Sequence, residues 1–173
     1  GLGGCISFYP AKTLGCFGDG GIVLTNDDNI YNVIKLMRDH GRGEDGNVSI
    51  WGFNSRLDNL QAAILNFFFQ DYDKTVNRRR GVADLYHEEL KDINELALPP
   101  ATNSNNNHFD IYQNYEIEAE RRDELKSFLS DNGIGTLIQW GGKAVHEFKD
   151  LGFTQSLPIT EKIMRDSLML PLN

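Results

Sequence analysis

The chain of 173 residues is long enough to bury a hydrophobic core and fits one large domain or parts of two. Its formal net charge of −8, without any basic block, argues against nucleic acid or an anionic membrane surface as a partner. No apolar run is long enough to span a bilayer. The densest basic cluster, Arg78 to Arg80, is interpreted as a solvated helix face.

Cysteine and histidine usage indicates neither a disulfide framework nor a metal site. Cys5 and Cys16 match no zinc or redox spacing, so both are interpreted as buried thiols in a reducing cytosol. No group of His, Cys, Asp and Glu has metal-ligand spacing, and no metal is expected. We therefore predict a cytoplasmic protein.

In chain order, the first predicted elements are two short strands and a helix. β-favouring apolar residues place the strands at residues 5–9 and 21–25, with a glycine-rich turn between them. A helix should follow and end near His40, because apolar residues recur at helical spacing after capping candidates at residues 26–28. A polar, glycine-containing loop is predicted at residues 41–55.

The middle of the chain shows one long helical pattern, from about residue 57 to residue 90, with Gly81 as the candidate kink. This segment is longer than a typical globular helix, which suggests an element that links two domains. We therefore predict a boundary near residue 75, with an α/β part at residues 1–75 and a small α+β part at residues 76–173.

The second part begins after Pro99-Pro100 with a solvated loop at residues 101–108. The elements predicted beyond it are a strand at 112–117, a helix at 121–132, a strand at 135–140 and a final helix at 160–168 capped by Thr160.

Lys12 is the first candidate for a residue that reacts covalently. It lies in the run Ser-Phe-Tyr-Pro-Ala-Lys-Thr-Leu-Gly, between apolar residues and a glycine turn. If the lysine is buried, its neutral amine form is favoured, and a neutral amine can attack an aldehyde to form a Schiff base. Ser7 and nearby backbone N–H groups could bind a phosphate. By physical reasoning alone, a solvated loop lysine remains the simpler alternative.

Two longer motifs carry a resemblance to a known family. The string from Ser7 to Gly21, Ser-Phe-Tyr-Pro-Ala-Lys-Thr-Leu-Gly-Cys-Phe-Gly-Asp-Gly-Gly, resembles the active-site lysine segment of the DegT/DnrJ/StrS family. Gly52 to Ala63, Gly-Phe-Asn-Ser-Arg-Leu-Asp-Asn-Leu-Gln-Ala-Ala, is similar to a second segment of that family. The string at residues 168–172, Leu-Met-Leu-Pro-Leu, is a weaker third match. The three occur in the family's order and cover essentially the whole chain.

The resemblance implies a fold and a cofactor. Members are pyridoxal-phosphate (PLP) dependent aminotransferases of the aspartate aminotransferase fold (fold type I) that act on nucleotide-linked keto-sugars. Residues 1–75 would then be the C-terminal part of the PLP-binding large domain, and residues 76–173 a small α+β domain, incomplete at its C-terminus. The aspartate that pairs with the pyridinium nitrogen lies before residue 1 in the family's order. We therefore expect a C-terminal-side fragment that is inactive alone.

The resemblance also implies roles for individual residues. Lys12 matches the Schiff-base lysine, which would later act as a general base. Ser7 matches a serine on the cofactor phosphate. Asn54 matches an asparagine that reaches the phosphate from the neighbouring subunit, which implies a homodimer with shared active sites. Arg56, in the same motif, is either a substrate-side residue or a structural ion-pair or helix-start contact.

A second set of candidates lies near residues 140–146, a region that contributes to the substrate side of the pocket in the family. Trp140 and His146 are candidate substrate-binding residues there. Trp140 and Gly141 depart from the commonest version of this segment, which puts the identity of the sugar in question and leaves the reaction class unaffected.

The predicted reaction is transfer of an amino group from glutamate to a nucleotide-linked keto-deoxysugar, in amino-sugar or polysaccharide biosynthesis. One alternative is a PLP-dependent sugar dehydratase, but members of that branch replace the lysine with histidine, and Lys12 argues against it. The other alternative is a non-catalytic dimerisation or sugar-nucleotide-binding remnant.

Overall fold

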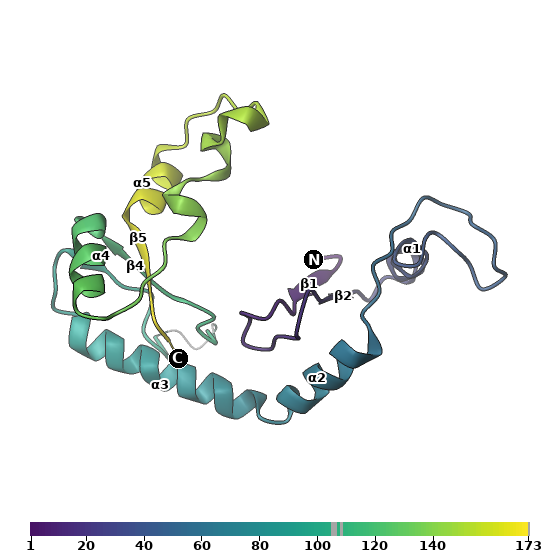
Figure 1. Cartoon of the computed structure of the whole chain (residues 1–173), viewed down its shortest axis with the longest axis horizontal. Coiled ribbons are helices and arrows are strands. Elements are labelled where there is room, and N and C mark those ends of the chain that lie inside the picture. The colour runs from purple at the N-terminus through teal and green to yellow at the C-terminus, as the bar shows by residue number, and fades with distance from the viewer. Residues whose placement is uncertain (105–106, 108, 173) are drawn as a thin grey trace. The chain divides into compact units, whose positions relative to one another are not determined.

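The computed structural model describes residues 1–104, 107 and 109–172. It divides into two compact units, Gly1–Asp73 and Lys74–Asn173 (Figure 1). The predicted loop at residues 101–108 lies partly outside the described residues.

The first unit contains one hairpin and two helices. Strands β1 (Gly4–Ser7) and β2 (Gly21–Leu24) pair antiparallel, with Gly4 opposite Leu24 and Ser7 opposite Gly21. Helix α1 (Asp28–Met37) follows, and the side chain of Asp27 caps it by accepting the backbone N–H groups of Asn29 and Ile30 at 2.8 and 3.1 Å. A loop then leads to helix α2 (Asn59–Phe69).

The first unit buries little apolar surface by itself. Cys16 and Leu65 are buried, whereas Ile22, Val23 and Leu24 of β2 remain 40%, 45% and 50% exposed. Exposed apolar patches of this kind are typical of surfaces that contact further protein.

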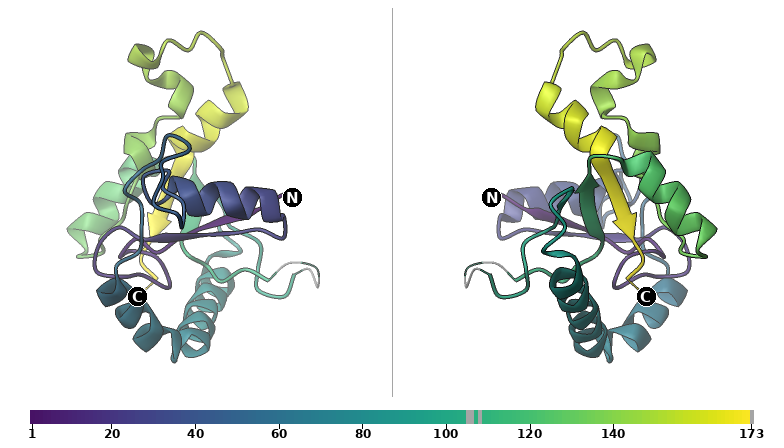
Figure 2. Two further views of the ribbon diagram at one scale, coloured as in Figure 1. Left: turned by 90° about the vertical axis from the view of Figure 1, so that its right-hand side faces the viewer. Right: turned by 90° about the vertical axis from the view of Figure 1, so that its left-hand side faces the viewer.

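The second unit is a three-stranded antiparallel sheet flanked by helices. Its strands β3 (Leu96–Ala97), β4 (Tyr115–Ala119) and β5 (Ser167–Leu170) are ordered β3-β4-β5. Figure 2 (right view) shows β5, in yellow, beside β4. The helices are α3 (Tyr72–Leu90), α4 (Arg122–Asp131) and α5 (Pro158–Asp166), with short 3₁₀ turns at Gln139–Gly142, Val145–Glu147 and Lys149–Leu151.

The core of this unit lies on one face of the sheet. In β4, Tyr115, Ile117 and Ala119 are buried and the residues between them are more exposed, which is the alternation of a half-buried strand. Helices α3 and α4 contribute apolar side chains to this face, among them Tyr86 and Leu125. Within the described part of the chain, the buried cluster consists of Ala83, Tyr112, Tyr115, Ile117, Leu168, Leu170 and Leu172.

Two of the arginines in the basic cluster bind backbone carbonyl groups in the second unit. Arg79 donates to the carbonyl oxygens of Tyr112 and Gln113, both at 2.8 Å. Arg80 donates to the carbonyl oxygen of Asp110 at 2.5 Å. The interpretation of this cluster as a solvated helix face was therefore wrong for Arg79 and Arg80, which hold the chain that enters β4.

Three tyrosine rings stack within the core, and their hydroxyl groups differ in bonding. Tyr115 lies between Tyr86 and Tyr112, with ring centroids 4.9 and 6.2 Å away. Tyr86 donates to the carbonyl oxygen of Pro171 and Tyr112 to that of Pro100. The buried Tyr115 hydroxyl has no hydrogen-bond partner among the described residues. Burial, followed by the neighbouring tyrosines, raises the pKa of Tyr115 to about 12.

Substituting these tyrosines should separate a bonded hydroxyl from an unbonded one. We expect Tyr112→Phe to lower the free energy of unfolding by about 1 kcal/mol, because a hydrogen bond is lost. Tyr115→Phe should leave it unchanged or raise it by up to about 1 kcal/mol. The folded-state pKa of Tyr115 is raised to about 12. The free energy of unfolding that depends on its un-ionised hydroxyl is therefore fully present below pH ~10 and is lost as pH rises toward 12.

The measurement is urea unfolding of both variants at pH 8 and at pH 11. Tyr115→Phe should also reduce the loss of stability at the higher pH. An equal cost for the two substitutions at pH 8 would contradict the assignment of the unbonded hydroxyl.

Several predicted elements differ from those observed. The long helical segment is broken at Gln70–Asp71, between α2 and α3, and Gly81 lies within the continuous helix α3. The predicted strand at 135–140 is wrong: only Leu137 pairs, through an isolated bridge to Met169, and a 3₁₀ turn follows. The predicted final helix ends at Asp166, and residues 167–170 form strand β5. Thr160 does not cap that helix, which begins at Pro158.

Candidate functional site

Lys12 lies in the connection between β1 and β2, which is closed at its base by backbone hydrogen bonds. The N–H of Phe8 donates to the carbonyl of Gly20, and the N–H of Cys16 donates to the carbonyl of Phe8, both at 2.8 Å. The N–H of Lys12 donates to the carbonyl of Tyr9 at 2.8 Å, so Lys12 closes a tight turn. We call residues 8–20 the lysine loop.

A glycine is required where the lysine loop folds back on this turn. A Cβ atom added at Gly15 would lie 2.7 Å from the carbonyl oxygen of Tyr9 and 2.8 Å from that of Pro10. Since real Cβ atoms do not approach backbone that closely, this position accepts only glycine without a backbone shift. The tight loop presents Lys12 in an exposed position in this chain, not in a buried one.

Ser7 ends β1 directly before the lysine loop. Its hydroxyl oxygen accepts the backbone N–H of Tyr9 at 3.2 Å, and the residue is exposed. Ser7 and Lys12 therefore come from the same strand-to-loop transition. Of the two cysteines, both free thiols, Cys16 is buried as expected, but Cys5 in β1 is exposed, contrary to our interpretation.

Asn54 and Arg56 lie on a segment that is bound to the end of α1. The N–H of Phe53 donates to the carbonyl of Met37 at 2.6 Å, and the N–H of His40 donates to the carbonyl of Phe53 at 2.8 Å. Two glycines allow this close approach: a Cβ at Gly41 would lie 1.8 Å from the carbonyl oxygen of Ile50, and a Cβ at Gly52 would lie 2.2 Å from the backbone nitrogen of Gly41.

The side chains of this segment form a polar cluster around Asp39. Arg42 and Arg56 each place a guanidinium nitrogen 3.0 Å from one of the Asp39 carboxylate oxygens. The contact with Arg56 is an ion pair without hydrogen-bond geometry, because that oxygen has no hydrogen-bond partner among the residues that the structure describes. The hydrogen bond from Arg42, together with the charges of both arginines, keeps the pKa of Asp39 below its usual value.

Asn54 is oriented by Arg56. The Arg56 guanidinium donates to Oδ1 of Asn54 at 2.9 Å. Because arginine can only donate, the amide oxygen of Asn54 must face it, and the NH₂ group of Asn54 is directed elsewhere as a donor. Asn54 does not cap α2, whose N-cap residue is Asp58. The ion pair between Arg56 and Asp39 is the structural role that the sequence offers as the alternative to a substrate-side role for Arg56.

The other two candidates, Trp140 and His146, belong to the second unit. Trp140 is 78% exposed and has a positive φ of 50°. His146 is buried, and its Nε2 lies 3.1 Å from Oε1 of Glu161. Glu161 also accepts the N–H of Leu157 at 2.7 Å. The hydrogen bond from Leu157, followed by the one with His146, lowers the pKa of Glu161. His146 thus ties its segment to the start of α5.

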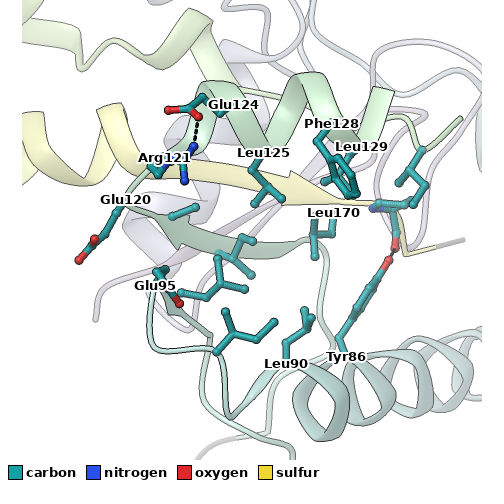
Figure 3. A pocket seen from close by; sticks show the side chains of 16 residues that line it. Tyr86, Leu90, Glu95, Glu120, Arg121, Glu124, Leu125, Phe128, Leu129 and Leu170 are labelled. Carbon is teal, nitrogen blue, oxygen red and sulfur yellow. Dashed lines mark hydrogen bonds and ion pairs between the residues drawn. The ribbon is translucent and has the colours of Figure 1, made fainter. Parts of the chain in front are cut away.

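An apolar cavity of about 580 Å³ in the second unit contains none of the candidate residues. Figure 3 shows it between Tyr86 and Leu90 of α3 and Leu125 and Phe128 of α4, with Leu170 of β5 behind them. Its lining is an extension of the hydrophobic core, and its charged residues are Glu95, Glu120, Arg121 and Glu124.

The described part of the chain has neither a metal-binding cluster nor a membrane-spanning helix. No group of three or more His, Cys, Asp and Glu side chains there could hold a metal ion. None of the helices in that part is both long and apolar enough to cross a membrane.

The profile of the DegT/DnrJ/EryC1/StrS aminotransferase family matches residues 1–173. The chain belongs to this family. Its relatives include a pleiotropic regulatory protein of Geobacillus stearothermophilus, 36% identical over 171 residues, with 96% of this chain and 45% of that protein covered. A dTDP-3-amino-3,4,6-trideoxy-alpha-D-glucose transaminase of Streptomyces venezuelae is 34% identical over 179 residues, with 96% and 44% covered. The chain spans about half the length of these curated relatives.

Solved structures of the family share the fold of this chain. DesV of S. venezuelae, crystallised in complex with a ketimine intermediate, has a TM-score of 0.89 and 34% identity, with 97% of this chain and 45% of DesV covered. NtdA of Bacillus subtilis, solved with bound cofactor PMP, has a TM-score of 0.85 and 25% identity, with 99% and 41% covered. The predicted family and fold class are thereby confirmed.

Proposed function

We propose that the protein containing this chain is a PLP-dependent aminotransferase that transfers an amino group from glutamate to a nucleotide-linked keto-sugar. Family membership and the position of Lys12 on a tight loop between two strands carry the proposal. The named activity of the S. venezuelae relative supports a nucleotide-linked amino sugar as the product.

The donors of the first unit fit PLP, which carries an aldehyde and a phosphate. Lys12 supplies an amine on an exposed loop, Ser7 a hydroxyl at its base, and Asn54 an NH₂ group that its bond to Arg56 directs away from the guanidinium. Amine, hydroxyl and amide donors suit an aldehyde and a dianion, whereas no carboxylate belongs to this donor set. When bound, the cofactor supplies an electron-withdrawing ring and a carbon that carries the amino group.

Separate roles are proposed for Lys12, Ser7 and Asn54. The amine of Lys12 would hold the cofactor and then move a proton between the substrate carbon and the cofactor as a general base. The Ser7 hydroxyl and the Asn54 amide would donate to phosphate oxygens. We propose that Asn54 serves the site of a partner subunit in a homodimer, with Arg56 and Asp39 holding its amide in place.

We propose a large PLP-binding domain over residues 1–75 and a small domain over residues 76–173, with Trp140 and His146 as substrate-binding candidates on the small domain. The exposed indole of Trp140 can contact a substrate directly. His146 would act through its bond to Glu161, which fixes the segment next to Trp140. We also propose a cytoplasmic location, since both cysteines are free thiols.

The test is to incubate the protein with PLP, reduce it with borohydride and map the modified peptide. We expect a phosphopyridoxyl group on Lys12 in the full-length gene product, followed by turnover with keto-sugar nucleotides and glutamate. A full-length protein that stays unlabelled would overturn the proposal and favour the non-catalytic alternative. Label on Lys12 together with loss of water from the sugar would favour the dehydratase.

A further inference from the structure

Gln61, near the start of α2, makes a two-way contact with the lysine loop. The N–H of Phe17 donates to Oε1 of Gln61 at 2.8 Å, and Nε2 of Gln61 donates to the carbonyl oxygen of Phe17 at 3.0 Å. One side-chain amide therefore satisfies both backbone polar groups of one residue, 44 positions earlier in the chain. The ring of Phe17 also lies 6.0 Å from that of Phe68 on the same helix.

The inner side of the lysine loop is held by Cys16. The Cys16 side chain is fully buried, and its single S–H is shared between the carbonyl oxygens of Phe8 at 3.1 Å and Gly18 at 3.2 Å. A Cβ at Gly20 would approach the sulfur to 2.6 Å, so the loop closes tightly on this thiol. Phe17, the next residue, faces outward and is 70% exposed, and the bonds to Gln61 hold its backbone.

We propose that Gln61 is a positioning residue for Lys12. This inference rests on the proposed function and assigns a role that acts through the backbone of Phe17. By tying Phe17 to α2, Gln61 limits the conformations that the lysine loop can adopt, so that the Lys12 amine is held ready for its reaction. Preorganisation of this kind increases reactivity without contact between the positioning residue and the reacting atoms.

Gln61 is chemically suited to this role because the contact requires a donor and an acceptor together. A leucine of similar size offers neither group. A glutamate in its ionised form can accept from the Phe17 N–H but repels the Phe17 carbonyl oxygen, and protonation restores a donor. The Glu variant should therefore regain function as pH falls, a signature that a general loss of helix stability would not produce.

The experiment compares wild type, Gln61→Leu, Gln61→Glu and Gln70→Leu in the full-length protein. Gln70 is the C-cap residue of α2, one residue beyond the helix, and is exposed, so Gln70→Leu is a matched control at the other end of α2. The readout is the rate at which PLP, followed by reduction, labels Lys12 at sub-saturating PLP, with the PLP incubation carried out from about pH 4 to about pH 8 so that it spans the ordinary pKa of a glutamate. Thermal unfolding midpoints and hydrogen exchange of the Phe17 amide without PLP accompany it.

We expect Gln61→Leu to label Lys12 about tenfold more slowly, because two hydrogen bonds that order the loop are lost. Gln70→Leu should match wild type. Gln61→Glu should be slow from pH 8 down to pH 5.5 and approach wild type near pH 4, where a carboxyl of ordinary pKa (about 4.3) gains a proton, which keeps the inference testable even where Gln61→Leu does not fold. Equal labelling rates in wild type and in both Gln61 variants would overturn this inference alone. An unlabelled wild type would overturn the proposed function, and this inference with it.

Discussion

Replacing Lys12 with alanine in the full-length protein should lower the rate of transamination by at least about 10²- to 10⁴-fold, because proton transfer by a positioned base contributes that much. Labelling by PLP and borohydride at this position should disappear entirely. Lys12→Arg should be equally inactive, since a guanidinium keeps its proton and cannot replace the amine.

The control for Lys12 is Lys126, an exposed lysine on α4 of the second unit. Lys126→Ala should keep both turnover and label. The two variants are compared by stopped-flow measurement of turnover and by peptide mapping of the reduced protein. Normal turnover in Lys12→Ala would refute the assignment of Lys12.

Gly41→Ala should unfold the segment that carries Asn54 and Arg56. Gly41 has a φ of +75°, and its Cβ would lie 1.8 Å from the carbonyl oxygen of Ile50. We expect the free energy of opening of this segment to fall by about 3 kcal/mol. About 1 kcal/mol comes from the left-handed backbone and about 2 kcal/mol from the clash. The affinity for PLP should weaken with it, because Asn54 would lose its fixed position.

Gly46 provides a matched control in the same loop. It has a φ of +81° but no atom within 4 Å of an added Cβ, so Gly46→Ala should cost only about 1 kcal/mol. Native-state hydrogen exchange of the His40 and Phe53 amides, which bond across this segment, measures the local free energy of opening. Equal protection in the two variants would mean that the approach of Gly41 to Ile50 is not required.

Local patterns in the sequence were enough to predict the hairpin and helix α1 of the first unit. The β-favouring runs predicted strands within a residue or two of those observed, and Asp27 caps α1 as a capping candidate should. The break at Gln70–Asp71 carries neither glycine nor proline, so no local signal distinguished it from a continuous helix.

The second unit shows where tertiary pairing overrides local pattern. Residues 167–168 continue the helical spacing of α5, but Ser167 pairs with Glu118 and Leu168 with Ile117, so the chain becomes strand β5. The reverse holds at residues 135–140, where a β-favouring run has a pairing partner only at Leu137. A strand forms where a neighbouring strand supplies hydrogen bonds, which no local pattern records.

The sequence by itself determined the family, the candidate lysine and the two motifs around it, because these depend on residue identity and spacing along the chain. Only the tertiary structure showed that the motifs touch, through Gln61 and Phe17, and that Arg56 orients Asn54 while His146 is engaged with Glu161. These contacts join residues through hydrogen bonds of fixed direction between separate elements. Such directions follow from how the elements pack, and they leave no periodic signal in the chain.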